Sequence, residues 1–130
     1  MKKRFTFYLS AICIFLILLC GCSSLKIDDN SIGSVKFIYG DAHIEKELSK
    51  EDAKTITEMF DGKTLKSDNP SCGFTENVSV TIDGKCFWIA CDQCGCVYFE
   101  QSLKYFNLNN EENEKLRGIL ETYGFTFPCI

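Results

Sequence analysis

The chain has 130 residues, of which 45% are hydrophobic and 25% are charged, and its formal net charge is −4. This length is enough for one small domain with its own core. The acidic balance disfavours nucleic acid and anionic lipid as partners, because both are recognised by basic surfaces.

The N-terminus carries three features in a fixed order. The basic residues 2–4 precede an apolar stretch over 5–19, and small residues then lead to a cysteine in Leu19-Cys20-Gly21-Cys22. A basic start, an apolar centre and a small-residue exit are typical of a secretory signal peptide. The apolar stretch is shorter than the ~20 residues of a membrane-spanning helix.

The sequence around Cys22 resembles the lipobox of bacterial lipoproteins, in which a leucine stands three positions before the modified cysteine and a small residue directly before it. The resemblance implies cleavage between Gly21 and Cys22 and a diacylglycerol on the Cys22 sulfur. Residues 1–21 would then be a signal peptide and residues 22–32 a lipidated, flexible tether. The mature protein would be extracytoplasmic, anchored by lipid to the bacterial cell membrane. An uncleaved anchor helix and an ordinary secretory peptide cut elsewhere are the alternatives.

Residues 33–130 show the pattern of a single α+β domain, which resembles in composition the small lipoproteins of Gram-positive bacteria; no activity follows from that resemblance. Alternating apolar positions indicate strands, and apolar stripes at helical spacing indicate helices. The predicted elements are strands over 35–39 and from 42, a helix over 50–61, a short strand over 63–66, strands over 78–82, 85–91, 96–100 and 103–106, a helix over 110–123, and an extended tail over 125–130.

Two-residue turns predict the register of two hairpins. Gly40-Asp41 fits a type II′ turn, which places Phe37 opposite Ile44. Asp83-Gly84 fits a type I′ turn, which makes the numbers of paired residues sum to 167.

N-cap signals mark the start of both helices. Ser49 is followed three residues on by Asp52, and Asn109 by Glu112. The expected fold is therefore an antiparallel β-sheet of five or six strands, with a β-β-α unit, a four-strand meander and a C-terminal helix. Both helices pack on one face, and disulfides brace the domain.

The lipobox decides how the nine cysteines are counted. Cys13 and Cys20 leave with the signal peptide and Cys22 carries lipid, so an even number remains. The six are Cys72, Cys86, Cys91, Cys94, Cys96 and Cys129. An even set in a small exported domain predicts a disulfide framework.

Strand register suggests the pairing. The second hairpin brings Cys72 toward Gly95, which favours a bridge to Cys94 or Cys96. A four-residue loop over 92–95 would place Cys91 opposite Cys96. From the tail, Cys129 could reach Cys86 or Cys72. The expected set is Cys72–Cys94, Cys91–Cys96 and Cys86–Cys129.

Two other uses of the Cys91–Cys96 cluster remain open. Together with Cys72, the thiolates of Cys91, Cys94 and Cys96 could form a tetrahedral metal site, but a second Cys-x-x-Cys arm is missing. Alternatively, Cys91 and Cys94 could be a redox pair, but no predicted helix starts there and Asp92 disfavours a thiolate. We expect no cofactor other than the covalent lipid.

The sequence contains no convincing catalytic set. The single histidine, His43, falls on the first hairpin, and phosphate-binding glycine motifs are absent. We therefore expect a non-enzymatic binding or structural module for a protein, peptide or envelope ligand, with Tyr98, Tyr105, Phe125 and Phe127 as candidate contacts. The alternative is an extracytoplasmic thiol-disulfide or metal-binding protein that uses the cysteine cluster.

Overall fold

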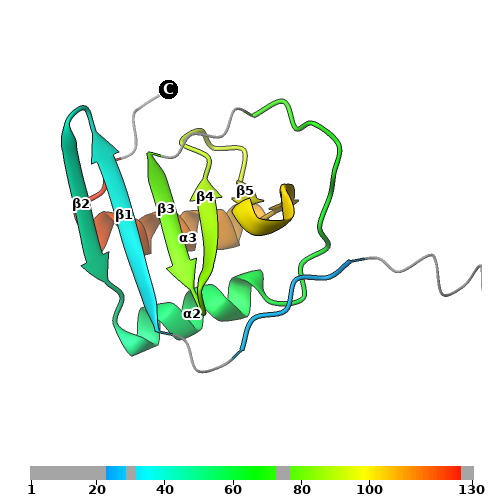
Figure 1. Cartoon of the computed structure of the whole chain (residues 1–130), viewed down its shortest axis with the longest axis horizontal. Helices are drawn as coiled ribbons and strands as arrows, with labels where there is room; N and C mark the ends of the chain where they lie inside the picture. Colours follow the sequence, from blue (N-terminus) through cyan, green and yellow to red (C-terminus); the bar gives the residue numbers. More distant parts are fainter. Residues whose placement is uncertain (1–22, 29–31, 73–76, 127–130) are drawn as a thin grey trace, which may run out of the picture.

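The computed structural model describes residues 23–28, 32–72 and 77–126. Within them, six strands form one antiparallel sheet in the order β2-β1-β3-β4-β5-β6. The elements are β1 (Gly33–Tyr39), β2 (Ala42–Glu47), α2 (Lys50–Phe60), β3 (Val78–Ile82), β4 (Lys85–Ile89), β5 (Cys96–Phe99), the 3₁₀ helix η1 (Glu100–Ser102), β6 (Lys104–Asn107) and α3 (Asn110–Thr122). Both α-helices lie behind the sheet in Figure 1. The expected α+β fold is confirmed.

Turn chemistry sets the two hairpin registers as predicted. Phe37 lies opposite Ile44, and in the β3–β4 hairpin the paired numbers sum to 167. Asp83 and Gly84 have φ angles of 52° and 68°, as a type I′ turn requires. The strand order adds that β1, and not β2, joins the first hairpin to the meander. Because β2 is exposed along its whole length and carries charged residues, it suits the edge of the sheet.

Both helices begin at the predicted caps. The Ser49 hydroxyl accepts a hydrogen bond from the Asp52 backbone N–H at 3.1 Å. Asn109 and Glu112 form a complete capping box, with bonds of 2.8 and 2.9 Å. Partial burial alone would raise the pKa of Glu112, but its bonds with Lys63 and the Asn109 N–H outweigh burial and lower the pKa. This carboxylate therefore ties the start of α3 to the chain that follows α2.

The core lies between the helices and one face of the sheet. At its centre the rings of Phe60, Phe87 and Phe106 meet edge to face, with centroids 5.0 to 6.1 Å apart. Each of these side chains is fully buried. Because both helices pack on one face and side chains alternate along a strand, every second side chain points to a face that neither helix covers.

The N-terminal segment corrects one expectation. Leu25 and Ile27 are only 2% and 8% exposed and belong to the main core. The Leu25 N–H donates to the Lys63 carbonyl, and the Leu25 carbonyl accepts from the Gly62 N–H, both at 2.9 Å. The prediction of a flexible tether over 22–32 is therefore wrong for 23–28, because two alternating apolar residues pack into the domain.

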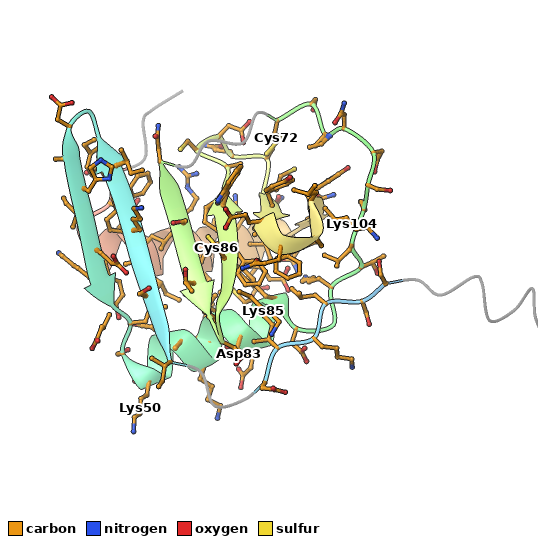
Figure 2. The ribbon with its side chains drawn as sticks, in the orientation of Figure 1. Lys50, Cys72, Asp83, Lys85, Cys86 and Lys104 are labelled. Atoms are coloured by element: carbon orange, nitrogen blue, oxygen red, sulfur yellow. A yellow bond between two sulfur atoms is a disulfide. The ribbon has the colours of Figure 1, made fainter. Side chains whose placement is uncertain are left out.

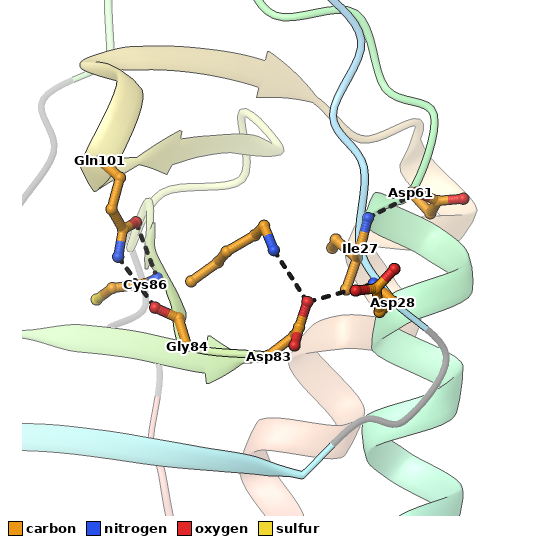
Figure 3. A network of polar contacts seen from close by, with 8 residues as sticks. Ile27, Asp28, Asp61, Asp83, Gly84, Cys86 and Gln101 are labelled. Atoms are coloured by element: carbon orange, nitrogen blue, oxygen red, sulfur yellow. Dashed lines mark hydrogen bonds and ion pairs between the residues drawn. The ribbon is translucent and has the colours of Figure 1, made fainter.

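Polar contacts hold the same segment at its far end (Figure 3). The Ile27 N–H donates to the Asp61 carboxylate at 3.0 Å, and the Asp28 N–H donates to Asp83 at 3.3 Å. Asp83 also accepts from the Lys85 ammonium at 2.9 Å, a hydrogen bond that lowers the pKa of Asp83. Residues 23–28 are thus bound to the end of α2 and to the β3–β4 turn.

The short strand expected over 63–66 is reduced to two isolated bridges. Ser24 pairs with Thr64, and Lys66 pairs with Tyr105 at the edge of β6. These bridges join three parts of the chain that are distant in sequence. Among the described residues, no helix has the length and apolar character needed to cross a membrane.

Burial of the N-terminal segment can be tested with Leu25→Ala in a chain that begins at Ser23. We expect the free energy of unfolding, measured by urea denaturation, to fall by about 3 kcal/mol, because a core leucine is truncated. The control is Ile32→Ala, since Ile32 is 85% exposed and should tolerate the change. Equal, near-neutral effects at both positions would show that residues 23–28 form a spacer.

Candidate functional site

Three cysteines meet on the face of the sheet opposite the helices. Cys72 and Cys94 form a disulfide, as expected, and Cys96 lies beside it on β5. The Cys96 sulfur is 3.7 Å from that of Cys72, and all three sulfur atoms lie within 4.8 Å of one another. The structure therefore brings together three of the four residues proposed for a metal site.

The fourth, Cys91, lies elsewhere, and the predicted Cys91–Cys96 bridge is wrong. Ile89 pairs with Val97, and the Ala90 N–H bonds to the Cys96 carbonyl, so Cys96 faces Ala90. The loop thus has five residues, 91–95, one more than expected. Cys91 packs against the main core, whereas Cys96 belongs to a small cluster on the opposite face.

Gly95 explains the longer loop. Its φ of +70° is a left-handed conformation that favours glycine. A Cβ at this position would lie 2.8 Å from the Leu108 carbonyl oxygen, so the backbone of the loop packs directly against the chain after β6. The Leu108 N–H donates to the Gly95 carbonyl at 2.8 Å, which fixes this approach.

The environment of Cys96 favours a protonated thiol. The side chain is buried, and its Sγ donates to the Asn107 side-chain carbonyl at 3.1 Å. Burial raises the pKa of Cys96, and the nearby Asp92 raises it further; the positive charge of Lys66 opposes them but does not reverse the shift. A reactive cysteine needs the opposite conditions, with positive charge or a helix N-terminus beside it.

The disulfide has a clear structural role. It connects the β4–β5 loop to the segment that crosses the sheet after α2, and it spans a sequence separation of 22. A closed loop of this size contributes about 3 kcal/mol to stability. Between α2 and Cys72 in the same segment, Lys66 exchanges two backbone hydrogen bonds with Tyr105, of 2.7 and 3.0 Å. The segment therefore passes along the outer edge of β6, and its Cys72 packs on the β5–β6 end of the face that the helices leave free.

The remaining expected bridge, Cys86–Cys129, involves Cys129, which lies outside the described residues. Cys86 stands on β4, on the face that Figure 2 turns toward the viewer. Burial and the nearby Glu100 raise the pKa of the Cys86 thiol. The predicted lipidation residue, Cys22, also lies outside the described residues.

Next to Cys86 the uncovered face is hollowed. A cavity of about 320 Å³ lies over β1, β3 and β4. Its lining includes Lys36, Glu45, Thr81, Cys86, Trp88 and Glu100. The rings of Trp88 and Tyr98 lie 5.0 Å apart, centroid to centroid, beside it. The hollow thus combines an aromatic surface with hydroxyl groups and charges of both signs.

The aromatic side chains differ in their availability for binding. Tyr105 and Phe125 are only 7% and 5% exposed, while Tyr98 is half-buried beside Trp88. Phe127 lies outside the described residues. Sequence reasoning did not select Trp88 as a candidate contact, although strand alternation already places its side chain on the face away from that of the buried Phe87.

No family model, curated protein or solved structure matches the chain.

The grouping of the thiols can be tested by titrating the reduced protein with Cd²⁺ and following the thiolate-to-metal absorbance. We expect Cys96→Ser to weaken this signal, because it removes one of three adjacent sulfur atoms. The matched variant Cys91→Ser should retain the signal. The reverse result would contradict the observed register of β4 and β5.

Proposed function

We propose that this protein is a lipid-anchored bacterial surface lipoprotein whose domain is a non-enzymatic binding module. The observation that carries the proposal is the division of the sheet into two faces. Helices cover one face, while the hollow beside Trp88 leaves side chains of mixed chemistry open to a ligand. A protein, peptide or envelope component outside the cell is the class of partner that we propose.

The lipoprotein part is supported by the lipobox resemblance at Cys22 and by the disulfide between Cys72 and Cys94. Disulfides are typical of proteins that fold outside the reducing cytosol. The binding part is supported by the chemistry of the hollow. An aromatic surface surrounded by polar groups can give a ligand both contact area and orientation.

Lipidation is tested by Cys22→Ala in the full chain expressed in a bacterial host. We expect the variant to lose its lipid adduct and its processing at residue 21, as measured by mass spectrometry and membrane fractionation. Cys20→Ala is the matched control, because alanine is an ordinary residue at that lipobox position. A Cys22→Ala protein of mature size that still fractionates with membranes would refute the lipoprotein proposal.

Binding at the hollow can be followed with the natural fluorophore, because Trp88 is the only tryptophan in the chain. We expect its emission to shift saturably when detergent-solubilised envelope fractions are added. In pull-downs from the same fractions, Trp88→Ala should lose the partners that Ile44→Ala retains, since Ile44 lies on the edge strand β2. Equal capture by both variants would show that the hollow is not the binding site.

A second candidate is an extracytoplasmic thiol-disulfide or metal-binding protein, and the three grouped sulfur atoms favour it. Once the disulfide is reduced, these thiols could hold a soft cation. Thiol chemistry is less well supported than binding, because burial and Asp92 both favour the protonated form of Cys96. The Cd²⁺ titration above measures the capacity on which this candidate depends.

A further inference from the structure

We propose that one edge of the domain lies directly on the membrane surface, with the Leu103 side chain inserted at the boundary between headgroups and acyl chains. The edge consists of Ser23, Lys66, Leu103 and Lys104, and we call it the lipid-facing edge. The proposal rests on the lipidation of Cys22 proposed above. It adds that the domain has a fixed orientation on the bilayer.

The first support is the short connection between the lipid and the fold. Ser23 directly follows Cys22, and its carbonyl accepts a hydrogen bond from the Leu65 N–H at 3.1 Å. The Ser23 hydroxyl accepts another from the Lys104 ammonium, also at 3.1 Å. One residue spans at most about 3.6 Å, so a lipid on Cys22 would enter the bilayer beside Lys104.

The second support is the exposure of Leu103. This side chain is 73% exposed at the turn between η1 and β6, directly before Lys104. Its backbone is left-handed, with φ 55° and ψ 34°, a conformation that is unfavourable for residues with a Cβ. An apolar side chain that stays in water contributes no hydrophobic free energy, whereas insertion into a bilayer would remove its apolar surface from water.

The third support is the distribution of charge. Residues 22–130 contain 11 basic and 18 acidic residues, a net charge of −7. The three segments that contribute residues to the lipid-facing edge, 23–28, 61–68 and 100–107, contain four of each, so their net charge is zero. Anionic headgroups would therefore repel the rest of the domain more strongly than this edge.

Ile32 provides the comparison that the test needs. It is 85% exposed, more than Leu103, but it lies directly before β1 in a depression that is also lined by Glu45, Lys46 and Glu47, which together carry a net negative charge. Exposure alone would make Ile32 the better membrane contact. We select Leu103 because the segments around it carry no net charge, and because it directly precedes Lys104, which bonds to Ser23 next to the proposed lipidation residue.

The test uses the full lipidated chain in vesicles of phosphatidylcholine and phosphatidylglycerol whose acyl chains carry bromine, which quenches tryptophan emission. The natural fluorophore is removed with Trp88→Phe, and Leu103→Trp or Ile32→Trp is added. We expect strong quenching for Leu103→Trp and little for Ile32→Trp. Equal quenching, or stronger quenching at position 32, would overturn the proposal.

Two further measurements separate the possible failures. Mass spectrometry of each sample establishes whether Cys22 carries lipid, so an absent adduct counts against the lipoprotein proposal and not against the orientation. If Leu103→Trp does not fold, hydrogen exchange of the unmodified sequence replaces it. Amides over 100–104 should exchange more slowly on vesicles than in the unlipidated chain, while those of the turn at 40–41 should not change. Unchanged exchange over 100–104 would overturn the proposal.

Discussion

The fold depends on the meeting of three phenylalanine rings, because they join α2 to both halves of the meander formed by β3 to β6. Phe60 comes from α2, Phe87 from β4 and Phe106 from β6, and all three are fully buried. With Phe87 directed toward the helices, its neighbour Trp88 must face the other way. The same packing that builds the core therefore places the only tryptophan on the uncovered face.

The alternation of side chains along the strands also determines which cysteines can form a disulfide or share a metal site. Cys91 packs on the helix side and Cys96 on the other, so no bridge forms between them and no four-thiol site is complete among the described residues. The disulfide that does form lies at the margin of the sheet, where it holds a crossing segment in place. The position of the disulfide and the protonated state of the Cys96 thiol both favour a structural role for the disulfide over thiol-disulfide exchange.

Local signals in the sequence predicted the helix caps and the turns correctly, whereas contacts between distant segments were predicted only in part, as for the Cys72–Cys94 disulfide. The caps at Ser49 and Asn109 and the Asp83-Gly84 turn each rest on a few neighbouring residues, and all three were predicted correctly. The loop before Cys96 was one residue too short in the prediction, because the packing of Gly95 on Leu108 is not visible in the sequence. Leu25 was placed in a tether for the same reason, since its partners at 62 and 63 are far along the chain.

The proposed orientation has a consequence for the hollow. β6 and β2 are the two edges of the sheet, separated by five strand spacings of roughly 4.8 Å, or about 24 Å. If the lipid-facing edge beside β6 rests on the bilayer, the charged strand β2 is the part farthest from the membrane. The hollow over β1, β3 and β4 then opens sideways, above the headgroups and parallel to the membrane surface. Such a position suits a partner that lies in the envelope close to the membrane, and a ligand buried within the bilayer would not reach it.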